Sequence, residues 1–463
     1  MKNKILTGFL LVLIGGWGSL SAQNVVSNYA RQVNTLIGTK GVGLTSGYLY
    51  PGATYPYGMV QFTPSYFSKR SGFVINQLSG GGCEHMGNFP TFPVKGKLKM
   101  SPDNILNYRI NISEEKGHAG YYEAKVQEDI HAKLTVTERT GMASYEYPAD
   151  QQYGTVIIGG GISATPIEQA AIVITAPNKC EGYAEGGNFC GLRTPYKVYF
   201  VAEFDTDALE SGTWKRNELK PNTTFAEGEY SGVYFTFDVD KKKNVQYKIG
   251  VSYVSVENAR ENLKAENTGW DFLQIQNQAE SKWNHYLGKI EVEGTNPDRT
   301  TQFYTHLYRS FIHPNVCSDV NGEYMGADFR VHKSRSKHYT SFSNWDTYRT
   351  QVQLLSILDP EVASDIVISH QLFAEEAGGA FPRWVMANIE TGVMQGDPTP
   401  ILISNAYAFG ARNYDPKPIW KIMRKGAEEP GTMSQNIEVR PGLKQYLDKG
   451  YYNASIQLEY TSA

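Results

Sequence analysis

The period of the hydrophobic pattern changes once along this chain, near residue 260. Upstream, apolar residues alternate with polar or small ones, most clearly at 130–136, 233–239 and 245–253. This period of two predicts strands with one buried face. Clusters of Gly, Pro and Asn separate these runs. The first half of the chain is therefore predicted to form a large antiparallel β-sandwich.

Downstream of residue 260, apolar residues recur every three or four positions, at 272–286 and 303–311. This spacing predicts amphipathic helices. A further helix is expected to begin at Asp359, where an N-cap aspartate precedes Pro360 and Glu361, and to end near Gly378. Two more helices are predicted around 405–412 and 419–425. A helical domain therefore follows the sandwich.

The amino terminus has the features of a secretory signal peptide. A lysine-containing start precedes an apolar run over residues 5–20, and small residues follow at Ser21 and Ala22. Cleavage near Ala22 would place the protein in a periplasm or outside the cell, with no later stretch long enough to span a membrane. A retained anchor is the alternative. The predicted organisation is a signal peptide at 1–22, a β-sandwich at 23–258, a helical linker at 259–295 and the first part of a helical barrel at 296–463.

Charge and composition restrict the kinds of ligand. The 44 Lys and Arg against 47 Asp and Glu give a net charge of -3, so no basic surface is expected to bind nucleic acid or anionic lipid. Aromatic residues make up 13% of the chain, with 31 Tyr and 7 Trp. Such rings stack on the apolar faces of sugars, although a tyrosine-rich sheet core explains the same composition.

Four cysteines lie at positions 83, 180, 190 and 317. Cys180 and Cys190 bracket a glycine-rich segment that reads as a loop, so they are predicted either to form a local disulfide or to remain as two buried thiols. No Cys-x-x-Cys or His-Glu-x-x-His spacing is present, so the sequence does not predict a zinc site.

The segment 344–349, Asn-Trp-Asp-Thr-Tyr-Arg, combines residue types that suit pyranose binding. Trp345 offers a stacking surface, Asp346 an acceptor for two adjacent hydroxyls, and Arg349 a fork of donors. The alternative is a structural pair of Asp346 with Arg349 at helical spacing.

A second segment, 382–398, places Arg383, Trp384, Glu390 and Asp397 in a glycine-punctuated loop between two predicted helices. Such a loop would border a ligand pocket. Glu390 and Asp397 could be read as the two carboxylates of a glycosidase, but their spacing in a loop does not fix their separation. Capping or solvated carboxylates are the alternative.

Three consecutive glycines at 80–82 allow a backbone to approach a ligand closely, while polar residues follow them. The candidate binding residues of this loop are Gly81, Gly82, Cys83 and Glu84. A plain turn between domains explains the loop equally well. His313 is a further candidate, although a single histidine is more often structural.

Taken together, segments 33–39, 51–61, 78–83, 303–326, 342–349 and 382–397 resemble the successive blocks of glycoside hydrolase family 92, in order and spacing. The resemblance implies a β-sandwich joined through a helical linker to an (α/α)6 barrel. It also implies a calcium-dependent, inverting exo-α-mannosidase that acts on α-mannoside glycans such as N-glycans. On this resemblance, the candidate residues of the two segments and the glycine loop surround the terminal mannose.

Two departures limit what the resemblance implies. Family members commonly carry His-Thr-His-Leu-Ser-Gly where this chain has Ile-Asn-Gln-Leu-Ser-Gly at 75–80. The family's acid, base and calcium ligands are expected beyond Ala463, so no catalytic residue and no metal ligand of this chain is assigned. The competing hypotheses are a non-catalytic mannoside-binding or structural fragment, and another (α/α)6 enzyme such as a phosphorylase.

Overall fold

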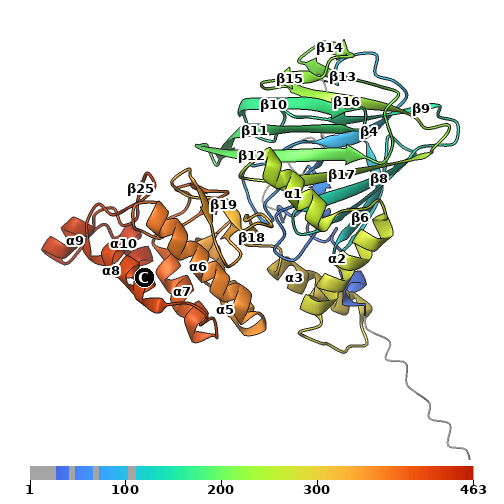
Figure 1. Cartoon of the computed structure of the whole chain (residues 1–463). Coiled ribbons are helices and arrows are strands. Elements are labelled where there is room, and N and C mark those ends of the chain that lie inside the picture. Colours follow the sequence, from blue (N-terminus) through green and yellow to red (C-terminus); the bar gives the residue numbers. More distant parts are fainter. Residues whose placement is uncertain (1–27, 41–46, 66–71, 103–110, 462) are drawn as a thin grey trace, which may run out of the picture.

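The computed structural model describes residues 28–40, 47–65, 72–102, 111–461 and 463. The predicted signal peptide at 1–22 lies outside these residues. Two large antiparallel sheets form one part of the molecule, and helices form the other (Figure 1). The predicted order, an antiparallel sandwich followed by a helical domain, is confirmed.

Within the described residues the first sheet has eight strands and the second has nine. The spatial order of the first is β1 (Ala53–Thr54), β2 (Gln61–Pro64), β3 (Phe73–Val74), β4 (Thr91–Lys95), β9 (Tyr153–Ile158), β16 (Ser231–Asp238), β13 (Glu210–Lys215) and β14 (Glu218–Pro221). The order of the second is β15 (Phe225–Glu227), β10 (Ile167–Ala176), β11 (Lys179–Phe189), β12 (Leu192–Phe204), β17 (Asn244–Ser252), β8 (Thr140–Glu146), β7 (Ile130–Val136), β6 (Tyr121–Val126) and β5 (Ile112–His118).

The core of the sandwich lies between the facing sheets. Phe204 on β12 packs against Phe235 and Phe237 on β16, with ring centroids 4.9 and 5.0 Å apart. All three side chains are almost fully buried. Strand β16 is buried on both faces over most of its length, so its apolar residues form the middle of the sandwich.

The helices carry capping residues where the sequence predicted helix starts. Asp359 accepts a hydrogen bond from the Val362 amide, with Pro360 in the first turn of α6. The helix predicted around 405–412 begins earlier, at Pro398, because a proline there starts α7 after Asp397. The helical elements are η1 (Tyr29–Gln32), α1 (Val256–Glu266), α2 (Phe272–Leu287), α3 (Pro297–Ser310), α4 (Asn344–Thr347), α5 (Gln351–Leu358), α6 (Pro360–Glu376), α7 (Pro398–Ala408), α8 (Pro416–Glu428), α9 (Leu443–Lys449) and α10 (Ala454–Thr461).

In the described part of the chain, four two-stranded antiparallel sheets lie between the helices. Their strands are β18 (Asn315–Val316) with β21 (Tyr339–Thr340), β19 (Glu323–Met325) with β20 (Val331–Lys333), β22 (Val385–Met386) with β23 (Ile389–Glu390), and β24 (Met433–Ser434) with β25 (Ile437–Glu438).

Helix α1 packs directly on strands β12 and β17 of the second sheet. Gly250 permits this approach, because a Cβ atom there would lie 2.4 Å from the Ala259 carbonyl oxygen. Helices α5 to α8 enclose a separate apolar core that includes Val367, Leu402 and Ile419. Trp420 and Leu458 are 60% and 73% exposed on this part of the molecule. No helix in the described ranges has both the length and the apolar character needed to cross a bilayer.

Candidate active site

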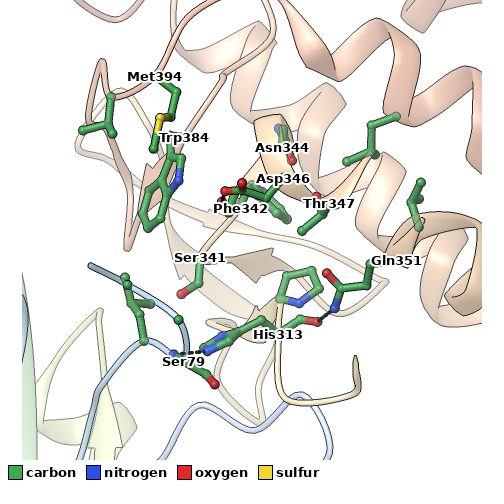
Figure 2. Close-up of a pocket in the computed structure, with 18 of the residues that line it drawn as sticks. Ser79, His313, Ser341, Phe342, Asn344, Asp346, Thr347, Gln351, Trp384 and Met394 are labelled. Carbon is green, nitrogen blue, oxygen red and sulfur yellow. Dashed lines mark hydrogen bonds between the residues drawn. The ribbon is translucent and has the colours of Figure 1, made fainter. Parts of the chain in front are cut away.

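A cavity of about 540 Å³ opens where the sandwich meets the helical domain. One wall comes from the glycine loop at 78–83 and the tip of the β11–β12 hairpin. The other comes from α4, α5 and the 382–397 segment (Figure 2). Segments nearly 300 residues apart in sequence therefore build one pocket.

Asn344 fixes the start of α4 at the floor of this cavity. Its side-chain amide donates to the Pro382 carbonyl at 3.1 Å and to the Thr399 hydroxyl at 2.7 Å, and it is buried. Two residues later, Asp346 lines the cavity and accepts a hydrogen bond from the Ser343 hydroxyl. Among the described lining residues, Asp346 is the only carboxylate. The site thus presents one acidic group to a ligand.

The other two candidates of the 344–349 segment lie outside the cavity lining. The Arg349 guanidinium lies 4.8 Å from the ring centroids of both Trp345 and Tyr348. No ion pair joins Arg349 to Asp346 within the described part of the chain. Trp345 and Arg349 therefore stack with each other, and Asp346 is the member of this motif that lines the cavity.

Arg383 and Glu390 hold the 382–397 segment together from within. The Glu390 carboxylate accepts hydrogen bonds from the amides of Arg383 at 2.6 Å and Gly392 at 2.9 Å. The Arg383 guanidinium donates to the carbonyls of Val393 at 3.0 Å and Gly392 at 3.2 Å. Burial raises the pKa of Glu390, although the hydrogen bonds to its carboxylate lower it. Neither residue lines the cavity, whereas Trp384 does.

Asp397 lies at the N-terminus of α7, outside the cavity lining. Its carboxylate forms an ion pair with Arg440 at 2.9 Å, and both side chains are largely buried. Burial raises the pKa of Asp397 although Arg440 lowers it. The structure therefore places Glu390 and Asp397 in separate local networks.

Two histidines anchor the glycine loop. The Leu78 amide donates to Nε2 of His85 and the Ser79 amide donates to Nε2 of His313, each at 2.8 Å. Both imidazoles therefore act as acceptors, and burial lowers the pKa of each to about 4. His313 thus lines the cavity while holding one of its walls.

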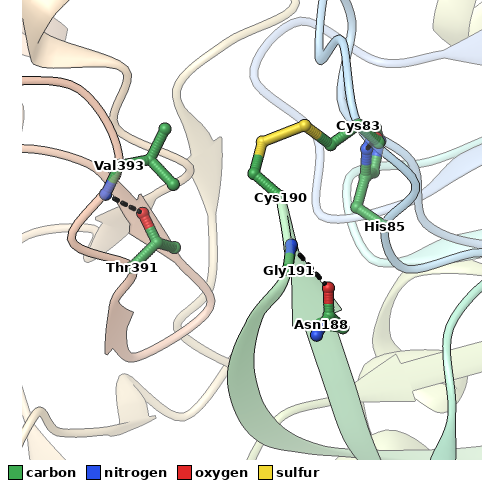
Figure 3. The surroundings of a disulfide bond; sticks show 7 residues. All are labelled: Cys83, His85, Asn188, Cys190, Gly191, Thr391 and Val393. Carbon is green, nitrogen blue, oxygen red and sulfur yellow. Dashed lines mark hydrogen bonds between the residues drawn. A yellow bond between two sulfur atoms is a disulfide. The ribbon is translucent and has the colours of Figure 1, made fainter.

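A disulfide between Cys83 and Cys190 joins this loop to the β11–β12 hairpin, across 107 residues (Figure 3). Neither alternative predicted for Cys180 and Cys190, a local bridge or two buried thiols, is correct for the pair, because Cys190 bonds to Cys83. Residues 179–189 form one continuous strand, β11, so ten residues separate those two cysteines by roughly 30 Å. Cys180 is instead a buried free thiol. Of the loop candidates, Gly81, Gly82 and Cys83 line the cavity and Glu84 does not.

An aromatic contact closes the gap between the two domains. Phe189, at the end of β11, packs on Trp384 with ring centroids 4.4 Å apart. Tyr48 and Met394 also line this side. Sequence reasoning missed Phe189, Tyr48 and Met394 as lining residues. Only the position of Phe189 next to Cys190 could have pointed to it.

The fold and cavity define a two-domain architecture in which a sandwich and a helical domain share one polar and aromatic pocket. Residues 32–252 match the glycosyl hydrolase family 92 N-terminal domain, and residues 258–463 match the glycosyl hydrolase family 92 catalytic domain. The chain belongs to glycoside hydrolase family 92, as the sequence motifs predicted.

Known relatives share this architecture. A family GH92 α-mannosidase of Bacteroides thetaiotaomicron superposes with a TM-score of 0.82 at 24% identity, over 94% of this chain and 61% of that one. An inverting family GH92 mannosidase of the same species gives 0.80 at 24%, over 93% and 60%. An uncharacterized secreted glycosidase of Arthroderma benhamiae is 25% identical over 488 residues, covering 96% of this chain and 58% of the relative. The chain thus spans about three fifths of the length of these relatives.

Proposed function

We propose that this chain is the mannose-binding part of an exported exo-α-mannosidase that releases terminal α-linked mannose from glycans. The observation that carries the proposal is the cavity between the two family 92 domains, which presents Asp346 and Trp384 to one small volume. Export is supported by the secreted relative and by the signal-like amino terminus. The α-mannosidase neighbours support the substrate class.

In this proposal the chain's own residues bind and orient the sugar. Asp346 can accept hydrogen bonds from two adjacent hydroxyls of a pyranose, since each carboxylate oxygen has free lone pairs beyond the one that Ser343 uses. The indole of Trp384 offers an apolar face for the C–H groups of the ring. Asn344 and the glycine loop hold these groups in place.

The same cavity limits which catalytic roles this chain supplies. An inverting glycosidase needs two carboxyl groups on opposite sides of the scissile bond, and Asp346 is the only carboxylate among the described lining residues. We therefore propose that the general acid and base lie outside these 463 residues. We also propose that hydrolysis proceeds with inversion, which the neighbouring inverting mannosidase supports.

Calcium is the cofactor that the family resemblance implies. Ca²⁺ takes six to eight oxygen ligands from carboxylates, carbonyls and water, and Asp346 is the only carboxylate that the described lining offers. The described residues of the cavity therefore do not fit a calcium site. Calcium dependence stays part of the proposal through the family alone, and no step is derived from it.

Binding of mannoimidazole, the ligand held by one of the neighbouring α-mannosidases, tests the proposed mannose site. We expect the folded chain to bind it, and to bind a glucose-configured imidazole more weakly, by isothermal titration calorimetry. Asp346→Asn should weaken binding by about 3 kcal/mol, roughly 100-fold in Kd, because hydrogen bonds to a charged acceptor contribute ~1.5–3 kcal/mol each.

Glu375→Gln is a matched control, because Glu375 is an exposed carboxylate on α6 outside the cavity. Its Kd should equal that of the unmodified chain. If the chain alone releases mannose from α-mannobiosides, the proposal that the general acid and base lie outside these 463 residues is wrong. If the folded protein does not bind mannoimidazole, the proposed mannose site is wrong. If it binds but no longer form of the chain hydrolyses mannosides, a non-catalytic binding protein is favoured.

A further inference from the structure

Three metal-ligating side chains converge near the end of α6, away from the cavity. Asp328 and His332 lie around the β19–β20 hairpin, and Glu376 is the last residue of α6. The His332 Nε2 atom lies 2.9 Å from Asp328 Oδ1 and 4.0 Å from Glu376 Oε1. One ligand atom from each residue lies within 4.8 Å of the others. None of the three lines the cavity described above.

Gly326 makes this convergence possible. A Cβ atom at this position would lie 2.6 Å from Cδ2 of His332 and 2.8 Å from a carboxylate oxygen of both Asp328 and Glu376. All three side chains would then have to move outward. The glycine thus leaves the space in which the three groups approach one another.

Basic residues offset the negative charge at this point only in part, because Arg330 acts on Asp328 through its charge without an ion pair. Among the described residues, no lysine or arginine forms an ion pair with Asp328 or Glu376. The Glu376 side chain is only 8% exposed. Two carboxylates therefore meet at one place, and among the described residues the imidazole of His332 is the only basic side chain within ion-pair distance of them, which favours a bound cation.

Neighbouring donors orient both carboxylates. The Tyr324 hydroxyl donates to Glu376 Oε1 at 2.7 Å, and the Ala327 amide donates to Oε2 at 3.0 Å. The Arg330 amide donates to Asp328 Oδ1 at 3.1 Å. Hydrogen bonds of this kind typically hold metal-binding side chains in place.

We propose that Asp328, His332 and Glu376 form a binding site for a transition-metal dication, represented by Zn²⁺. One imidazole nitrogen and two carboxylate oxygens suit Zn²⁺ at about 2.0–2.2 Å and leave a fourth position for water. The nitrogen ligand distinguishes this site from one for Ca²⁺, which prefers oxygen alone. On binding, the Nε2 lone pair goes to the metal, and the neutral ring carries its one hydrogen on Nδ1.

The site would connect the hairpin to the segment beneath the cavity. The Asn388 side chain donates to the Gly326 carbonyl at 3.0 Å, and Gln435 donates to the carbonyls of Ala327 at 2.7 Å and Asn388 at 2.9 Å. Asn388 lies between β22 and β23, in the hairpin that follows Trp384. A bound metal would therefore rigidify the support of this cavity wall, independently of the proposed mannosidase activity.

Titration of chelator-treated, dialysed protein with ZnCl₂ tests this site. We expect one equivalent of Zn²⁺ to bind tightly and to raise the Tm of the protein. His332→Ala should weaken Zn²⁺ binding at least ~100-fold. Co²⁺ should give the visible absorption of a four-coordinate site in the unmodified chain, and not in Asp328→Asn.

His131→Ala is the matched control, since His131 pairs with Glu123 at 3.4 Å and no third metal-ligating side chain joins them among the described residues. It should retain the unmodified Zn²⁺ affinity. Equal Zn²⁺ binding by unmodified protein and His332→Ala would overturn the proposal. The proposal would also be overturned if Ca²⁺ bound more tightly than Zn²⁺, or if added Co²⁺ kept the absorption spectrum of the hydrated ion.

Discussion

His85 shows at the scale of one residue how the cavity wall depends on protonation. Its Nε2 atom accepts a hydrogen bond from the Leu78 amide at 2.8 Å, and the residue is 1% exposed. Burial lowers its pKa to about 4, against 6.5 when unfolded. Its neutral form therefore stabilises the fold above pH 6.5, and this stability, roughly 3 kcal/mol, is lost as the pH falls toward 4. His85→Gln keeps an acceptor without this titration, so its Tm should fall less between about pH 7 and pH 4.5.

Melting curves followed by circular dichroism across this pH range would measure the effect. His131→Gln serves as control, because the His131 side chain is 37% exposed. Its Tm should fall with pH as much as the Tm of the unmodified chain. An unchanged acid dependence in His85→Gln would show that other groups govern acid stability.

Individual roles were harder to predict than residue types. The sequence identified Glu390 and Asp397 as carboxylates of a loop beside a pocket. Their partners depend on chain folding, because Asp397 pairs with Arg440, 43 residues away, and Glu390 satisfies backbone amides. Asp346, by contrast, lines the cavity, and its role in binding stays a prediction.

The glycine loop, as an element, provides a matched pair of substitutions. A Cβ atom at Gly81 would lie 2.8 Å from Cε1 of His85, whereas at Gly82 the nearest atom is Cε2 of Tyr48 at 3.9 Å. Gly81→Ala should therefore displace the loop, at a cost of about 1–3 kcal/mol, and weaken mannoimidazole binding. Gly82→Ala should leave the free energy of unfolding and the affinity for mannoimidazole nearly unchanged. Thermal unfolding and titration calorimetry would compare them, and equal effects of the two would contradict the role assigned to His85.

Elements with a regular hydrophobic period were predictable, and a glycine-rich element was not. Residues 245–253 and 272–286 fold as the strand and helix that their periods indicate. The segment between Cys180 and Cys190 reads as a loop but is strand β11. Gly182 is needed there because a Cβ atom would lie 2.2 Å from the Ala171 carbonyl oxygen of the neighbouring strand. Such close approach is a property of the assembled sheet.

The whole molecule depends on a buried junction between the two family 92 domains. The order of sandwich and helices follows from the change of period, but the residues that meet across the boundary do not. Asp319, which is 2% exposed, accepts hydrogen bonds from Ser252 at 2.7 Å, Asn258 at 2.8 Å and Asn262 at 2.6 Å. Its carboxylate thus joins the end of β17, helix α1 and the segment before β19.

Asp319→Ala would leave these buried donors without their acceptor, which costs ~1–3 kcal/mol for each unsatisfied group. We expect a lower Tm and a calorimetric transition that separates into a sandwich step and a helical step, since the coupling between the domains is lost. Asp240→Ala should keep the single transition of the unmodified chain, because the Asp240 side chain is 72% exposed. If Asp319→Ala also melts in one transition at an unchanged temperature, the two domains are held together by their apolar contacts, and the buried carboxylate is dispensable.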